Sequence, residues 1–561
     1  MPEPGVESFV GRGGLLWRAL PAEAAWVRSA LAADPDGVAL LPGATVVKRN
    51  PVRTVVRVPR AGGGAVFVKR FATGGLVGLA KYAVVPSRAE AEWRAARALR
   101  EAGIPSSEAI AVAEARRGPL LLDAFVVLRE VKGAMDLVPW MFRRYPGEGP
   151  WPPDRAGERA RLLERLGGLV RRLHDAGFVH PDLHGGNLLL SGAPDAPEMT
   201  IIDLHTVRRR AAVAAAERER DLVRVLHSMI TATDAAERAA VARAYDAAGP
   251  AFPGGDAAAR VERRIAALEG ERLRSRTRRR KLLGPTGRFD VARRGDLSLV
   301  FLRRWGDGPF LCALEEHRRA AGAAVLKRGG RSTVTRVSVD GPDGPERLVV
   351  KETRVRGAGD LLRNALRPPR AVQGWIAGNG LWQRHLDCAE PRAVAVRGRW
   401  PLLRESFLVM EDAGGGERYD LRALRLWGGG PPGPRARAQK REDLERFGRF
   451  VGDLHAAGVY HGDLKAVNVF VREKHGAPAF CLVDYDRVAF GGGPVPRRRR
   501  LKNLAQLAAS VGTFVGRSDR LRFYRAYASR LPGAWEDRRP AATAVAAACA
   551  RKIVVVRDPI E

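Results

Sequence analysis

The sequence predicts an α+β protein of two tandem bilobal domains, each with a small β-rich lobe and a larger helical lobe. The chain has 561 residues, too many for one ordinary domain, and its 45% hydrophobic content is enough for two cores. One polar motif occurs twice, at a constant offset of 281 residues (463 − 182 and 484 − 203). The first copy follows several strand signals and then a helix with a leucine stripe. A duplicated two-lobed domain accounts for these observations.

Breaks and basic runs in the sequence set the expected domain limits. We expect the first domain over residues 1–285, with its core in 43–230, and the second over residues 286–561, with its core in 322–530. Residues 1 to about 40 are expected to form a short helical preface. The arginine-rich run 272–281, followed by Gly284 and Pro285, indicates the end of the first helical lobe and a linker, or else a site for an anionic acceptor.

A lysine and a glutamate in the first β-rich lobe are expected to form an ion pair. Three strand signals form a meander, and the third ends at Lys69. The next helix starts with a capping box of Ser87 and Glu90, which gives Glu90 a structural role. Glu92 shares its helix face with the apolar positions, so Glu92 is the expected partner of Lys69. The alternative is two solvated surface groups.

The polar motif itself carries the predicted chemistry. In the first domain it reads HPDLHGGN from His180 to Asn187, and a short apolar strand then leads to Asp203. Phosphoryl transfer needs a group that orients the attacking hydroxyl and oxygen ligands for Mg²⁺. The spacing predicts Asp182 as the catalytic residue and Asn187 and Asp203 as magnesium ligands. Lys69, supported by Glu92, is predicted to bind the phosphates of ATP.

The second copy repeats this arrangement as HGDLKAVN from residue 461 to residue 468. Asp463 is the predicted catalytic residue, and Asn468 and Asp484 are the predicted magnesium ligands. Lys351 and Lys465 are predicted to bind the nucleotide.

One helix differs between the copies. Trp93 aligns with Trp375, which places Gly374 at the position of Glu92. Lys351 therefore lacks its expected glutamate. Two readings stay open for the second domain: catalysis with altered support for its lysine, or nucleotide binding without turnover.

With these residues in place, the chain resembles the Kdo/WaaP-type lipopolysaccharide kinase family, also called the InaA group, and more distantly RIO-type and aminoglycoside phosphotransferases. The resemblance covers roughly residues 43–226 and 322–511 and implies a protein-kinase-like fold in each half. It also implies ATP- and Mg²⁺-dependent phosphorylation of a sugar hydroxyl in the lipopolysaccharide core or a related glycolipid. The residues that carry it are Lys69, Glu92, Trp93, Leu173, His174, Gly177, His180, Asp182, Asn187 and Asp203.

Departures from protein kinases favour an acceptor that is not a peptide. Pro181 and Gly462 stand where protein kinases carry an arginine before the catalytic aspartate, and the segment after Asp203 is short. Neither segment 48–54 nor segment 327–333 contains GxGxxG, so the arginines and hydroxyls of these turns are candidate phosphate ligands. Two alternatives remain: an atypical protein kinase acting on tyrosine or serine, and a nonenzymatic pseudokinase scaffold.

The formal charge of +34 predicts attraction to anionic surfaces. We expect an anionic glycolipid or lipopolysaccharide acceptor and peripheral contact with the inner membrane, although a solvated basic surface is the simpler alternative. No nucleic-acid-binding motif is apparent, so no specific nucleic-acid partner is expected. Without an apolar run of about 18 residues or a secretory signal, a cytoplasmic location is expected. The four cysteines show no CxxC spacing, which supports neither a zinc site nor a disulfide framework.

Overall fold

The computed structural model divides into two compact units, Met1–Glu269 and Gly270–Glu561, and each is described here by itself. Within the described residues, no helix combines the length and the apolar character that crossing a membrane requires. The residues described are 5–50, 52–73, 75–146, 151–252, 256–357, 359–360, 368–399, 402–413, 416–428, 433–474, 477–511, 515–531 and 533–550.

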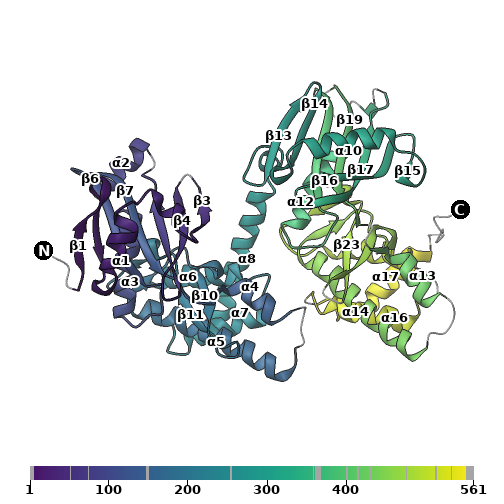
Figure 1. The fold of residues 1–561 in the computed structure, drawn as a ribbon. Helices are drawn as coiled ribbons and strands as arrows, with labels where there is room; N and C mark the ends of the chain where they lie inside the picture. The colour runs from purple at the N-terminus through teal and green to yellow at the C-terminus, as the bar shows by residue number, and fades with distance from the viewer. Residues whose placement is uncertain are drawn as a thin grey trace. The chain divides into compact units, whose positions relative to one another are not determined.

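The small lobe of the first unit is built on a seven-stranded antiparallel sheet in the order β1-β2-β6-β7-β5-β4-β3 (Figure 1). The predicted meander forms β3, β4 and β5, and Val55 pairs with Lys69 across β4 and β5. The strands are β1 (Glu7–Val10), β2 (Leu16–Ala19), β3 (Thr45–Arg49), β4 (Arg53–Pro59), β5 (Ala65–Phe71), β6 (Ala109–Arg117) and β7 (Leu120–Arg129).

The expected helical preface is wrong for residues 5–20. This segment contains β1 and β2, and β2 pairs with β6 in the sheet. Trp17 and Ala19 point into the core and are fully buried, while Leu16 is exposed. Four-residue strands are too short to show a clear period of two, which is why the sequence pattern did not reveal them. Only the later part of this segment is helical, in α1 (Pro21–Val27).

Helix α3 (Arg88–Glu101) packs against this sheet and carries the predicted glutamate. The Ser87 hydroxyl caps the helix by accepting a hydrogen bond from the Glu90 amide at 3.0 Å. The Glu90 carboxylate pairs with Arg18 and Arg94 instead of returning to the cap, so only half of the capping box is formed. Glu90 is structural, as expected.

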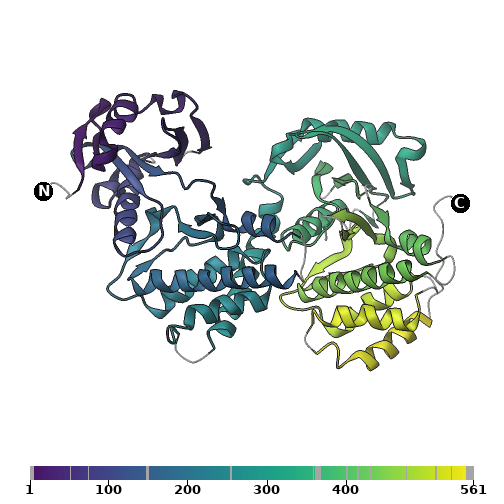
Figure 2. The ribbon, with the colours of Figure 1, turned by 60° about the horizontal axis from the view of Figure 1, so that its bottom comes forward.

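The large lobe of the first unit is mainly helical and is organised around α5 (Pro153–Asp175) (Figure 2). His174 is buried at the end of α5, where its Nδ1 lies 2.8 Å from the Tyr245 hydroxyl. The leucine stripe on α5 is buried, with Leu162, Leu163, Leu166, Leu169, Val170 and Leu173 in the core. The other helices of this lobe are α4 (Leu137–Arg144), α6 (Ala215–Ser228), α7 (Ala235–Asp246) and α8 (Ala257–Arg276), which passes the boundary between the units. Helix α2 (Gly75–Val84) contacts β7 of the small lobe.

The second unit repeats this plan. Its seven-stranded sheet has the order β13-β14-β18-β19-β17-β16-β15, which matches the first sheet strand by strand. The predicted fold class is confirmed, since each unit joins a β-rich lobe to a helical lobe. Its strands are β13 (Phe289–Arg294), β14 (Leu297–Leu302), β15 (Val325–Arg328), β16 (Ser332–Gly341), β17 (Gly344–Arg354), β18 (Pro391–Arg399) and β19 (Leu402–Glu411). Its helices are α9 (Arg279–Leu282), α10 (Gly308–Arg319), α12 (Arg370–Trp382), α13 (Tyr419–Trp427), α14 (Pro434–Ala456), α15 (Arg497–Ala508), α16 (Arg517–Ala528) and α17 (Arg538–Ala550).

Candidate active sites of the two domains

Short strands hold the predicted catalytic loop of the first domain in place. Strand β9 (Phe178–Val179) pairs with β12 (Arg208–Arg209), and β10 (Leu188–Ser191) pairs with β11 (Glu198–Ile201) and with β8 (Met135–Asp136). The loop runs from β9 into a 3₁₀ turn, η4 (Gly185–Asn187), before β10 begins. The Ile202 amide donates to the Asn187 carbonyl at 3.0 Å, which joins the loop to the residue before Asp203.

Asn187 is fixed against the backbone of the predicted catalytic residue. Its Nδ2 donates to the Asp182 carbonyl at 2.9 Å, and its side chain is buried. Because the amide nitrogen is used in this way, Oδ1 is the donor atom that Asn187 can offer to a cation. The Asp182 carboxylate takes no part in this contact.

Asp203 lies at the centre of a cluster of cationic groups. Its backbone is left-handed, with φ 60° and ψ 52°, which turns the chain sharply into η5 (Leu204–Thr206). Its carboxylate accepts from Arg53 Nη1 at 2.9 and 3.1 Å and from Lys69 Nζ at 3.4 Å, and its Oδ1 lies 3.0 Å from His205 Nδ1. Burial by itself raises the pKa of Asp203, but His205, Lys69 and Arg53 together hold that pKa well below its ordinary value. The carboxylate is therefore ionised at neutral pH.

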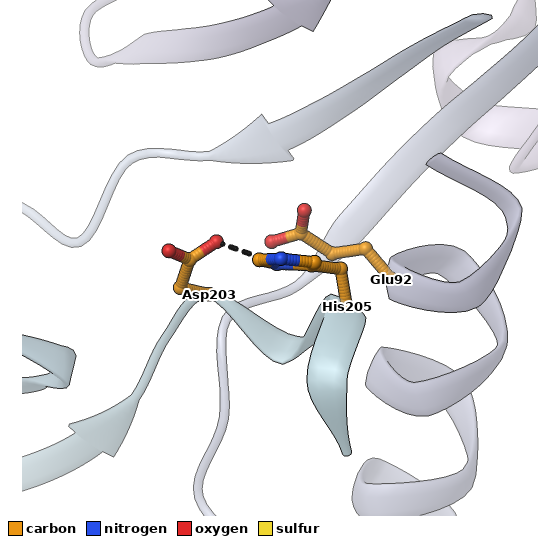
Figure 3. Close-up of side chains that lie close together, drawn as sticks. All are labelled: Glu92, Asp203 and His205. Atoms are coloured by element: carbon orange, nitrogen blue, oxygen red, sulfur yellow. Dashed lines mark hydrogen bonds and ion pairs between the residues drawn. The ribbon is translucent and has the colours of Figure 1, made fainter. Parts of the chain in front are cut away.

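The structure brings together the predicted lysine and glutamate. Lys69 Nζ lies 2.7 Å from Glu92 Oε1, and the Glu92 side chain is fully buried. Figure 3 shows Glu92, Asp203 and His205 converging, with ligand atoms within 4.8 Å of one another. The Lys69 ammonium already contacts both carboxylates of this group, so we interpret it as the site of a lysine cation rather than of a metal ion.

Two contributors to this site were not chosen from the sequence. Arg53 begins β4 and reaches Asp203, although the sequence pointed only to the arginines of this turn in general. Asp221 on α6 is fully buried and accepts a hydrogen bond from the His180 amide at 2.7 Å, which anchors the start of the catalytic loop. A carboxylate on the buried face of an amphipathic helix was the available signal for Asp221.

The second domain reproduces the catalytic loop. Asn468 Nδ2 donates to the Asp463 carbonyl at 2.9 Å, the same contact and length as in the first domain. Asn468 ends a 3₁₀ turn, η9 (Ala466–Asn468), and leads into β22 (Val469–Lys474), which pairs with β23 (Ala477–Leu482) and with β20 (Glu417–Arg418). Lys465 Nζ lies 2.9 Å from Asp463 Oδ1. The predicted nucleotide-binding Lys465 therefore contacts the predicted catalytic carboxylate in this structure.

Lys351 has carboxylate partners, although not from its helix. Its Nζ pairs with Asp484 Oδ1 and lies 3.4 Å from Asp486 Oδ2. Asp484 has the same left-handed backbone as Asp203, with φ 53°, and precedes η10 (Tyr485–Arg487). Burial raises the pKa of Asp484, but the Lys351 charge and hydrogen bond hold it below its ordinary value.

The donor atoms in both domains fit a magnesium ion by type. Each domain offers one amide oxygen, from Asn187 or Asn468, and one ionised carboxylate, from Asp203 or Asp484. Mg²⁺ prefers such hard oxygen ligands and is commonly bound by one or two protein groups together with water and phosphate oxygens. The roles of these residues stay predictions.

Comparison with known proteins identifies the family. The model of the lipopolysaccharide kinase (Kdo/WaaP) family matches residues 79–245 and 315–527, which together exceed half of the chain and include both catalytic loops. The chain belongs to this family. The resemblance expected from the sequence motifs is thus confirmed, and the chain is a member of a kinase family with two copies of the family domain.

Several curated relatives are lipopolysaccharide kinases. The chain is 31% identical over 243 residues to the lipopolysaccharide core heptose(I) kinase WaaP of Pseudomonas aeruginosa, covering 41% of this chain and 84% of that protein. It is 28% identical over 142 residues to WaaP of Escherichia coli, covering 24% of this chain and about half, 51%, of that relative. A 3-deoxy-D-manno-octulosonic acid kinase of Stenotrophomonas maltophilia is 33% identical over 145 residues, covering 26% of this chain and 51% of that protein.

Among solved structures, WaaP in complex with acyl carrier protein matches 47% of this chain and 99% of its own, with 23% identity and a TM-score of 0.34.

Proposed function

We propose that the first domain transfers the γ-phosphoryl group of ATP to a sugar hydroxyl of the lipopolysaccharide core or a related glycolipid. The observation that carries this proposal is the buried ion pair between Lys69 and Glu92, with Asp203 next to it. The catalytic loop with Asp182 and Asn187 is tied by its backbone to the strand that delivers Asp203. Positioning and charge neutralisation of this kind are the main protein contributions to phosphoryl transfer.

Each residue has one defined task in this mechanism. The Asp182 carboxylate orients the sugar hydroxyl and accepts its proton as the oxygen attacks phosphorus. Lys69, held by Glu92, binds the phosphates that carry the leaving charge. Asn187 Oδ1 and the ionised Asp203 carboxylate are the groups that would hold magnesium, which would neutralise phosphate charge. Arg53 is close enough to Asp203 to bind a phosphate oxygen when a cation occupies that carboxylate.

A sugar acceptor is supported by the sequence after Asp203. Helix α6 begins at Ala215, so only a short segment separates it from Asp203, where protein kinases build a peptide-docking platform. The names of the relatives, a heptose kinase and a 3-deoxy-D-manno-octulosonic acid kinase, point to the same acceptor class. The net charge of +34 favours an anionic glycolipid and peripheral contact with an anionic membrane surface on the cytoplasmic side.

A transfer assay with γ-labelled ATP and magnesium tests this proposal. The full chain is offered lipopolysaccharide or a mixture of soluble proteins, in separate reactions. We expect label on the lipopolysaccharide core, and we expect Asp182→Asn to reduce the transfer assigned to the first domain by at least about 100-fold. Asp195→Asn, at an exposed position after the same loop, is the matched control and keeps full transfer.

Each alternative has its own outcome in this assay. Label on tyrosine or serine with none on the glycolipid contradicts the sugar acceptor and favours an atypical protein kinase. Transfer that is unchanged in a double variant, Asp182→Asn with Asp463→Asn, contradicts the assigned catalytic residues. A chain that binds ATP but labels no acceptor supports the pseudokinase scaffold.

A further inference from the structure

The two domains place their second carboxylate on different elements. Offsets of 281 and 282 residues pair His205 with Asp486 (486 − 205) and Glu92 with Gly374 (374 − 92). The first domain therefore has glutamate on its helix and histidine after the metal-binding aspartate. The second domain has glycine on its helix and aspartate after the metal-binding aspartate. The acidic side chain thus lies on the helix in the first domain and in the loop after the strand in the second domain.

Asp486 contacts the lysine that lost its glutamate. Its Oδ2 lies 3.4 Å from Lys351 Nζ, and its side chain is only 10% exposed. A partly buried ammonium without a nearby carboxylate would be costly, and Asp486 supplies the second negative charge beside Asp484. In the first domain the same count of two carboxylates around the lysine comes from Glu92 and Asp203.

The surroundings of Gly374 leave no room for a side chain there unless the Leu408 side chain moves. A Cβ atom at Gly374 would lie 2.6 Å from Leu408 Cδ2, closer than real contacts allow, and 3.9 Å from Asp486 Cβ. Leu408 pairs with Lys351 across β17 and β19, and the residue in the same place in the first domain is Val126, which pairs with Lys69. Leu408 therefore fills the space that a side chain at position 374 would enter. Asp486 borders the same space.

The residue before Asp486 fixes it in place. Tyr485 is fully buried, and its hydroxyl donates to the Ala389 carbonyl at 2.6 Å. The ring lies against Gly378 of α12, where a Cβ atom would be 2.7 Å from the ring. The corresponding pair in the first domain is Leu204 and Ala96, so a larger loop residue is matched by a smaller helix residue. This coupled change anchors η10 and with it the Asp486 carboxylate.

We propose that Asp486 is the positioning residue for Lys351 and takes over the task that Glu92 performs in the first domain. The inference rests on the proposed function, because it assigns nucleotide phosphates as the ligand of Lys351. It gives the second domain a supported lysine, which both readings of that domain require for nucleotide binding. Both carboxylates of this site come from one continuous segment, residues 484–486, so the support of the lysine does not depend on an acidic residue from α12.

Nucleotide binding by the second domain tests the role of Asp486. The full chain carries Lys69→Met to remove binding by the first domain, and a fluorescent ATP analogue is titrated in the presence of magnesium. We expect Asp486→Asn to raise the dissociation constant for the ATP analogue by about 10-fold or more, as for other supporting residues around a ligand-binding group. Asp486→Glu restores most of the affinity. Asp343→Asn, at an exposed aspartate of the second domain, is the control and leaves this binding unchanged.

A transplant of the first arrangement separates positioning from a general loss of structure. The triple variant Gly374→Glu, Leu408→Val and Asp486→His gives the second domain the residues of the first, and it should bind more tightly than Leu408→Val with Asp486→His. Equal affinity of the Lys69→Met parent and its Asp486→Asn derivative overturns this inference and leaves nucleotide binding by the second domain in place. A Lys69→Met parent that binds no nucleotide overturns the nucleotide-binding function of the second domain, and the inference with it.

Discussion

The two domains share one catalytic loop geometry but support their lysines differently. Asn187 and Asn468 make identical 2.9 Å contacts with the carbonyls of Asp182 and Asp463. In contrast, Lys69 is paired with a fully buried glutamate on a helix, whereas Lys351 is paired with two aspartates that follow β23. A glycine at the helix position therefore does not by itself identify an inactive domain, because a charge can be supplied from a neighbouring element.

The catalytic loop is the same in the two domains, whereas the acidic partner of the lysine is not. The backbone contacts of the loop depend on an exact spacing of residues, and they are retained after duplication. The acidic partner of the lysine, in contrast, differs in position between the two domains. In the first domain α3 carries it, and in the second domain η10 carries it.

The largest expected effect comes from removing each lysine. Lys69→Met should reduce sugar phosphorylation by the first domain by about 10²- to 10³-fold, because one charge that stabilises the transferred phosphoryl group is lost. Rates of transfer from labelled ATP to lipopolysaccharide measure the effect. Lys81→Met, at an exposed lysine on α2, is the control and keeps the parental rate. A loss from Lys351→Met that equals the loss from Lys69→Met would show that both domains contribute to the same transfer.

The buried side chain of His455 should make the free energy of unfolding of the second helical lobe depend on pH. Burial lowers the pKa of His455 to about 4, so the folded state binds its proton less well than the unfolded chain does, whose pKa is near 6.5. His455 stabilises the fold fully above pH 6.5, and this contribution decreases as pH falls from 6.5 toward 4, by about 3 kcal/mol in total.

Urea unfolding at several pH values measures this contribution. His455→Gln keeps a polar group next to the Tyr527 hydroxyl, which lies 2.9 Å from His455 Nδ1, but has no titrating ring. Its unfolding free energy should vary less between pH 6.5 and 4 than that of the parent. The same slope in both proteins would assign the pH dependence to other groups.

Removing the helix glutamate should have a smaller effect on catalysis than removing the lysine. Glu92→Gln keeps the shape of the side chain but removes the charge that holds Lys69, and we expect transfer to fall by about 10- to 100-fold. Glu101→Gln, at an exposed position on the same helix, serves as the control. Transfer by Glu92→Gln at the parental rate would contradict the role of the ion pair, even if Lys69→Met is inactive.

The smallest effect is expected at Asp221, a position where the second domain has asparagine. Asp221 accepts from the His180 amide at 2.7 Å, and the matching Asn503 donates to the His461 carbonyl at 2.6 Å. Asp221→Asn keeps an acceptor oxygen, so the free energy of unfolding should fall by only about 1 kcal/mol. Asp221→Ala leaves the His180 amide without its partner and should cost about 2 to 3 kcal/mol. Chemical denaturation measures both, and an equal loss in the two variants would contradict the anchoring contact.

The sequence predicted the fold and the residues of the catalytic loops because their signals are local. Fixed spacing from Asp182 to Asn187 and an apolar strand before Asp203 describe one continuous segment each. The helix face of Glu92 followed from a period that one segment also contains. These signals do not require knowledge of the packing between distant segments.

The missed features depend on contacts between segments far apart in the chain. Asp486 comes close to Lys351 only after the two lobes of the second domain pack together, and its sequence position matches a histidine in the first copy. Arg53 reaches Asp203 across 150 residues of sequence. Strands β1 and β2 were missed because short strands are recognised by their pairing partner, here β6, rather than by their own pattern.

Mass spectrometry of the lipopolysaccharide core tests the central claim most directly. Core oligosaccharides are compared from a strain lacking this protein and from the same strain carrying the full chain, Asp182→Asn or the control Asp195→Asn. The account predicts that a phosphate on a core sugar is missing in the deletion strain, and that the full chain and Asp195→Asn restore it while Asp182→Asn does not. Core phosphorylation that is the same in the deletion strain as in its parent, or that Asp182→Asn restores fully, would contradict it.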